Sequence, residues 1–199
     1  MAQADVLIVG GGVIGLAIAV ELRQQGATVT VISRDFAAAA AHAAAGMLAP
    51  QAEKLSGPLL TLSQRSLALY PEWTQKLEAL TGTSTGFWPC GILAPLLSPQ
   101  GISPSSPSPS SPSPHPHSPQ VPSHSNSALL SATTLHHYQS GLSPDLTGGY
   151  FYPEEGQVDN RALTHALRSA AVSLGVTLQE GVTVEAVLQR QGQVAGVLT

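Results

Sequence analysis

Residues 5–22 read DVLIVGGGVIGLAIAVEL, and this stretch decides the fold of the chain. A short aliphatic run leads into the pattern Gly-x-Gly-x-x-Gly, and small and apolar residues typical of a packed helix follow it. Gly26 can end that helix, and residues 28–32 again have the composition of a strand. The order strand, helix, strand predicts a β-α-β unit with two parallel strands, and hence an α/β fold.

The three glycines of the pattern have different physical roles. Gly10 permits a tight turn, Gly12 has no Cβ and so lets a pyrophosphate approach the backbone, and Gly15 lets the helix lie close to the sheet. The start of the helix would direct free N–H groups and the positive end of its dipole at the phosphates. The complete unit therefore predicts a dinucleotide site, with an ordinary tight turn between buried elements as the alternative.

The end of the second strand departs from the usual dinucleotide pattern. An Asp or Glu about 20 residues after the glycines commonly binds the ribose, whereas this chain has Ser33, Arg34 and Asp35. Ser33 can still hydrogen-bond a ribose hydroxyl. Arg34 indicates either a 2′-phosphate or only a solvated charge beside Asp35, and the sequence leaves both open.

Composition excludes several classes of function. With 199 residues, 43% of them hydrophobic and 10% charged, the chain can bury a core. The net charge of −4 and the absence of a basic cluster give no reason to expect nucleic acid as a partner. The uncharged run 6–20 contains four glycines and is too short for a membrane span. The single cysteine, Cys90, suits a reducing compartment, so we expect a cytoplasmic protein.

The alanine-rich stretch 36–50 has two interpretations. Alanine is the best helix former, which favours a short helix. Alternatively, its methyl groups followed by Gly46 would let a flat aromatic ring lie against the backbone, near the N–H groups of Gly46 and Met47. His42 could bind a phosphate or simply face solvent.

Two segments together carry a resemblance to a known family. The glycine turn, the segment AAGMLA at 44–49 and the residues QAE at 51–53 resemble the glycine oxidases. These are FAD-dependent members of the D-amino-acid oxidase family, and one form serves thiamine biosynthesis. The similarity extends through nearly the whole chain except one insertion.

The resemblance implies that FAD binds and which residues surround it. The pyrophosphate would lie at Gly10, Gly11, Gly12, Val13, Ile14 and Gly15, and the adenosine ribose near Ser33 and Arg34. Ala40 and Ala41 would lie along the cofactor. Ala45, Gly46 and Met47 would lie at the isoalloxazine ring, and the backbone of Val184 would contact the adenine. Ser33 stands where such proteins often carry Glu.

Chain order predicts a Rossmann-like FAD-binding domain interrupted by part of an α+β substrate domain. We expect the FAD-binding domain in 1–55 and again in 159–199, and the partial substrate domain in 56–158. Residues 98–127 include 12 Ser and 9 Pro and no charge, so they predict a disordered insertion. Its three histidines lack Cys, Asp or Glu neighbours and do not indicate a metal site.

The remaining elements follow from periodicity. Leucines spaced three, four or seven apart predict an amphipathic helix from Ser56 to Gly82, which Pro71 should kink or split. A strand is expected at 87–94 and another at 149–152. A helix capped by Asp159 or Asn160 precedes strands at 176–179, 182–188 and 194–198.

The resemblance implies an oxidase that deaminates glycine or another small amino acid to the oxo acid, ammonia and hydrogen peroxide. Its partners would be the amino acid and oxygen, with homo-oligomers possible, and the cofactor would carry the chemistry without a catalytic residue from this chain. We expect the chain to be an N-terminal fragment, inactive alone. The alternatives are a sarcosine- or glycerol-phosphate-type dehydrogenase of the same fold, or a non-catalytic nucleotide-binding fragment.

Overall fold

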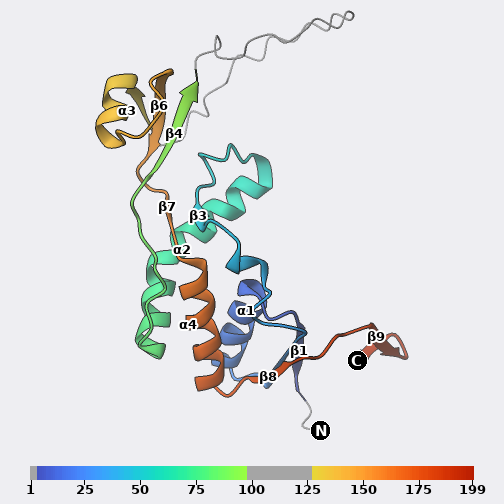
Figure 1. Ribbon diagram of the computed structural model, residues 1–199. Coiled ribbons are helices and arrows are strands. Elements are labelled where there is room, and N and C mark those ends of the chain that lie inside the picture. Colours follow the sequence, from blue (N-terminus) through green and yellow to red (C-terminus); the bar gives the residue numbers. More distant parts are fainter. Residues whose placement is uncertain (1–3, 98–126) are drawn as a thin grey trace, which may run out of the picture. The chain divides into compact units, whose positions relative to one another are not determined.

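Residues 4–97 and 127–199 are described by the computed structural model, and they form two compact units (Figure 1). Each unit combines segments that are distant in sequence. The first unit comprises Met1–Leu48, Ser66–Trp88 and Gln157–Thr199, and the second comprises Ala49–Arg65 and Pro89–Gly156. The predicted insertion 98–127, apart from Ser127, lies outside the described residues.

The predicted β-α-β unit is confirmed. Strand β1 (Val6–Val9), helix α1 (Val13–Gln24) and strand β2 (Val29–Ser33) follow one another, and the two strands are parallel. Strand β8 (Thr177–Glu180) joins them from far along the chain and pairs in parallel with β2, which gives the strand order β1-β2-β8. The three carboxyl ends therefore share one edge of the sheet, where ligands of such folds bind.

Helix α4 (Asn160–Ser173) packs with α1 in the core of the first unit. The carboxylate of Asp159 caps it by accepting hydrogen bonds from the N–H groups of Arg161 (2.9 Å) and Ala162 (3.0 Å), which settles the choice of cap. The face toward the core is buried at Leu163, Ala166, Leu167 and Ala170, whereas Leu174, just after the helix, is only partly buried.

Helix α2 (Gly57–Thr81) continues from the second unit into the first and contains Pro71 without a break. Of the two predicted effects of Pro71, a kink or a split, the split does not occur. The apolar face was also predicted too broadly, because Leu69 is 60% exposed and Leu62 is 65% exposed. Within this helix only Thr74 and Leu77 are buried, so the core reaches one short part of its length.

The second unit contains an antiparallel sheet with the order β4-β6-β5. Its strands are β4 (Ile92–Leu97), β5 (Ala128–Ser131) and β6 (Leu146–Tyr152), and helix α3 (Ala132–Tyr138) packs on β6. The strand expected at 87–94 thus begins only at Ile92. Glu155, three residues after the end of β6, is fully buried. Its carboxylate accepts hydrogen bonds from the backbone N–H groups of Gln51 (2.5 Å) and Ala52 (3.3 Å).

The alanine-rich stretch forms no α-helix. It contains only a 3₁₀ turn, η1 (Ala40–His42), before the two-residue strand β3 (Met47–Leu48). Near the end of the chain, β7 (Gly156–Gln157) precedes α4, and β9 (Ala186–Arg190) forms a separate antiparallel hairpin with β10 (Gln193–Leu198). None of the helices in the described ranges is long and apolar enough to cross a membrane.

Candidate functional site

The tight turn predicted at Gly10 and the close approach of helix and strand predicted at Gly15 are both present. Gly10 adopts φ +110° and donates from its N–H to the carbonyl of Ile32 (2.8 Å). A Cβ at Gly15 would lie 2.1 Å from the carbonyl oxygen of Gly10, so helix and strand approach too closely for any side chain there. Both glycines are therefore required by the fold itself.

Gly12 has a different environment. It is the N-cap of α1, with an extended backbone (φ −80°, ψ −178°), and no side chain caps the first turn. A Cβ at Gly12 would meet only the Cβ of Ala39, at 3.8 Å. The space beside Gly12 is thus open, and the N–H groups of Val13 and Ile14 face it at the positive end of the helix. This arrangement fits a pyrophosphate.

Gly11 has a role that the sequence pattern did not indicate. A Cβ at this position would lie 2.1 Å from Cε1 of Phe36, whose ring is buried (3% exposed). The turn therefore packs against an aromatic side chain from the loop after β2. The only signal in the sequence was the position of Phe36 shortly after the second strand.

In the loop after β2, the side chain of Asp35 forms hydrogen bonds within the loop itself. Oδ1 of Asp35 accepts hydrogen bonds from the backbone N–H groups of Ala37 (2.7 Å) and Ala38 (3.3 Å). Ser33 is almost buried and Arg34 is exposed. Ser33 therefore stays close to the carboxyl end of β2, while the Arg34 side chain extends into solvent.

A pocket of about 510 Å³ lies beside the stretch after η1. Two side chains of α4 hold this stretch in place: Nδ2 of Asn160 donates to the carbonyl of Ala44 (3.1 Å), and Nε of Arg161 donates to that of His42 (3.2 Å). Neither residue was among the sequence candidates, because both lie more than 110 positions away along the chain. Trp88 also lines the pocket and is 59% exposed.

The structure gives a different physical reason for glycine at position 46 than the approach of a cofactor ring. Gly46 adopts φ +81°, and a Cβ there would lie 2.0 Å from the carbonyl oxygen of Val158. Its own carbonyl accepts a hydrogen bond from the N–H of Val158 (2.9 Å). The close neighbour that requires glycine is thus protein backbone. Met47 beside it is 52% exposed.

The structure brings most of the predicted residues to one edge of the sheet. The turn 10–15, the end of β2 with Ser33, and Ala39 at the start of η1 are joined by the contacts above. Ala40 and Ala41 lie within η1, and Ala45 belongs to the pocket lining. Val184 follows Gly181, whose N–H donates to the carbonyl of Arg34 (3.2 Å). Within residues 4–97 and 127–199, no cluster of three or more His, Cys, Asp or Glu side chains could hold a metal ion.

Comparison with known proteins identifies the family of this chain. Residues 5–199 match the family described as DAO, FAD dependent oxidoreductase. The chain is 53% identical over 196 residues to the bifunctional protein ThiO/ThiG of Nostoc sp., covering 98% of this chain and 28% of that protein. It is 31% identical over 178 residues to the glycine oxidase of Geobacillus kaustophilus, covering 88% of this chain and 45% of that protein.

A solved structure shows the same likeness in three dimensions. The glycine oxidase of Bacillus cereus superposes with a TM-score of 0.80 at 25% identity, covering 98% of this chain and 51% of that chain. The chain thus spans about half or less of the length of the relatives it matches. The match to the family extends over nearly all of the 199 residues. The chain belongs to the family of FAD-dependent oxidoreductases.

Proposed function

We propose that the protein containing this chain is an FAD-dependent oxidase of glycine or another small amino acid, which serves thiamine biosynthesis. The products would be the oxo acid, ammonia and hydrogen peroxide. The observation that carries the proposal is the open space at Gly12 beside an uncapped helix start, in a chain whose family uses FAD. The 53% identity to a ThiO/ThiG protein supports the choice of substrate and pathway.

When bound, FAD supplies the redox chemistry, and the residues of this chain hold it. The N–H groups of Val13 and Ile14 would donate to the pyrophosphate at Gly10–Gly15. Ser33 and Arg34 would meet the adenosine ribose, and the backbone of Val184 would meet the adenine. Ala40 and Ala41 would lie along the cofactor, and Ala45, Gly46 and Met47 would flank its ring. Asn160 and Arg161 would fix the backbone of 42–44 by their hydrogen bonds.

The proposal also concerns where in the chain FAD binds and where in the cell the protein works. The first unit would bind FAD, since it contains the glycine turn and the parallel sheet. The net charge of −4 and the single cysteine favour a cytoplasmic protein without nucleic acid or membrane partners. Association into homo-oligomers is compatible with this function.

The proposal is tested by flavin binding to the purified protein and its Gly12→Val variant. A Cβ at Gly12 has room in the protein itself, but an isopropyl group would fill the space of the pyrophosphate. We therefore expect flavin absorbance to be lost while the circular dichroism spectrum is kept. Gly141→Val is the matched control, because a Cβ at Gly141 also meets nothing within 4 Å but lies in the second unit. Equal flavin content in parent and Gly12→Val would contradict the proposed site.

A further inference from the structure

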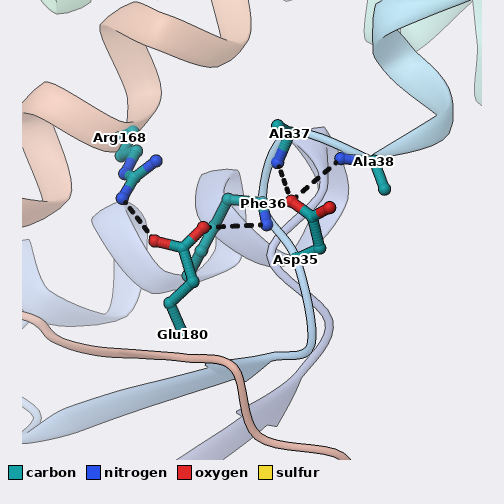
Figure 2. A network of polar contacts seen from close by, with 6 residues as sticks. All are labelled: Asp35, Phe36, Ala37, Ala38, Arg168 and Glu180. Carbon is teal, nitrogen blue, oxygen red and sulfur yellow. Dashed lines mark hydrogen bonds and ion pairs between the residues drawn. The ribbon is translucent and has the colours of Figure 1, made fainter.

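One side chain of β8 connects three parts of the first unit (Figure 2). Oε1 of Glu180 accepts a hydrogen bond from the backbone N–H of Phe36 (3.3 Å), and Oε2 pairs with Nη2 of Arg168 (3.0 Å). Glu180 is the last residue of β8, Arg168 belongs to α4, and Phe36 lies in the loop after β2. This group of three residues is called the clasp below.

The clasp reaches the glycine turn through the ring of Phe36. The guanidinium carbon of Arg168 lies 4.8 Å from the centre of that ring, within the range of a cation–π contact. The ring is 3% exposed and occupies the place that a side chain at Gly11 would need. The position of the ring therefore sets how closely the loop after β2 approaches the turn.

The backbone reinforces the same connection. Ser33 and Glu180 are register partners at the carboxyl ends of β2 and β8. Beyond them, the N–H of Gly181 donates to the carbonyl of Arg34 (3.2 Å), and the N–H of Val182 donates to that of Ser33 (3.4 Å). The side chain of Glu180 and the backbone of the two residues after it are thus attached to the end of β2 and the loop that follows it.

The charges of the clasp are too exposed to matter much for global stability. The side chains of Arg168 and Glu180 are 46% and 48% exposed, and ion pairs at such positions contribute little to folding. Oδ1 of Asp35 accepts from the N–H groups of Ala37 and Ala38, whereas the N–H of Phe36 donates to Glu180. The geometry of the clasp therefore points to local positioning.

We propose that Glu180 and Arg168 are positioning residues for FAD. They hold the Phe36 ring against Gly11, and thereby fix the distance between the turn that would bind the pyrophosphate and the loop that would meet the ribose. This inference rests on the proposed function, because the glycine turn and the loop after β2 are taken to bind adjacent parts of one cofactor. Neither side chain needs to touch the cofactor for this role.

The test uses Glu180→Gln and Arg168→Met, with Glu185→Gln and Arg190→Met as matched controls. The controls remove the same charges from exposed positions near β9. The first readout is the Kd for FAD, measured by flavin fluorescence at a temperature far below the melting temperature of every variant. The second is the rate of trypsin cleavage after Arg34 in protein stripped of FAD, since that exposed bond lies inside the loop.

We expect both clasp variants to raise the Kd three- to tenfold and to speed cleavage after Arg34, and both controls to change neither. Arg168→Lys, which keeps the charge, should restore part of the affinity. Parent-like Kd and cleavage in Glu180→Gln would overturn the inference, as would a lowered melting temperature with an unchanged Kd. A parent protein that binds no FAD would instead overturn the proposed function, so the two failures are distinguishable.

Discussion

At Gly12 and Gly15, three residues apart in one turn, an added methyl group would meet opposite surroundings. At Gly12 the nearest atom is the Cβ of Ala39, at 3.8 Å, an ordinary contact distance. At Gly15 it is the backbone oxygen of Gly10, at 2.1 Å, which cannot move without breaking the turn. A methyl group therefore has room at Gly12, whereas glycine at position 15 is required for the packing between helix and strand.

We expect Gly15→Ala to lower the free energy of unfolding by about 2–4 kcal/mol, as overpacking against an immovable group does. Gly12→Ala should change it by less than about 1 kcal/mol. Urea unfolding followed by circular dichroism measures both variants. Similar losses of stability at the two positions would show that the turn can relax around Gly15.

The environment of Glu78 predicts how the stability of the protein depends on pH. Its Oε1 accepts hydrogen bonds from the N–H (2.7 Å) and the hydroxyl (2.8 Å) of the fully buried Thr85, and a weaker one from Ser84. The bonds from Thr85, first its N–H and then its hydroxyl, lower the pKa of Glu78. The resulting stabilisation should be present above the unfolded-state pKa, about 4.5, and be lost as the pH falls through the lower folded-state pKa.

Glu78→Gln isolates this contribution. The difference in unfolding free energy between parent and variant should shrink as the pH is lowered from about 5 to about 3, because the parent loses its ionised carboxylate there. Glu72→Gln is not a suitable control, because its carboxylate pairs with Lys76; Glu53→Gln changes an exposed carboxylate instead. A difference that does not vary with pH would contradict the assignment.

Among the elements, α2 contains an unusual residue for its position. Pro71 lies inside an unbroken helix, although it lacks an N–H and its ring crowds the preceding turn. It is exposed, so replacing it removes little packing. We expect Pro71→Ala to raise the free energy of unfolding by about 1–3 kcal/mol, since proline costs about 3 kcal/mol against alanine in helices.

Chemical denaturation of the parent and Pro71→Ala measures this gain, with Pro58→Ala as a control in the first turn of the same helix. There the missing N–H would have no helical partner, so the control should change stability little. A decrease in stability for Pro71→Ala would mean that the proline stiffens the unfolded chain more than it strains the helix.

The elements differ in how well the sequence predicted them. The β-α-β unit was predicted because the glycine spacing and the aliphatic periodicity are local signals. The absence of a helix in 36–45 was not predictable, since its backbone groups bond instead to side chains of Asp35, Asn160 and Arg161. Two of these partners come from α4. A similarly long separation along the chain hides the hydrogen bond between Glu180 and Phe36.

At the scale of the whole molecule, the arginines decide whether this chain can orient a substrate. A small amino acid needs a cation for its carboxylate, because a buried carboxylate is costly unless it is paired. Arg23 donates to the carbonyls of Leu174 and Ala27, Arg161 donates to that of His42, and Arg168 pairs with Glu180. These three guanidinium groups already have protein partners, and the other three arginines, Arg34, Arg65 and Arg190, are exposed to solvent.

We therefore expect the 199-residue chain alone to release no peroxide from glycine or sarcosine, even when it holds FAD. Orientation of the reactants can supply about 7–11 kcal/mol of barrier lowering, and this would be lost. A peroxide assay against free FAD tests the prediction, with the complete glycine oxidase of Geobacillus kaustophilus as the positive control. Peroxide above the free-FAD background would show that these 199 residues suffice for substrate orientation.

The pairing of β2 with β8 also has a consequence for synthesis on the ribosome. Thr30 pairs with Thr177, so at roughly 5–20 residues per second the partner strand emerges some 7–30 s after β2. Helix α4, which packs on α1, emerges only shortly before it. During that interval the aliphatic side chains of Leu16, Val20 and Val31 lack the neighbours that bury them in the finished protein. The first β-α-β unit should therefore keep part of its apolar surface exposed until α4 and β8 have left the ribosome.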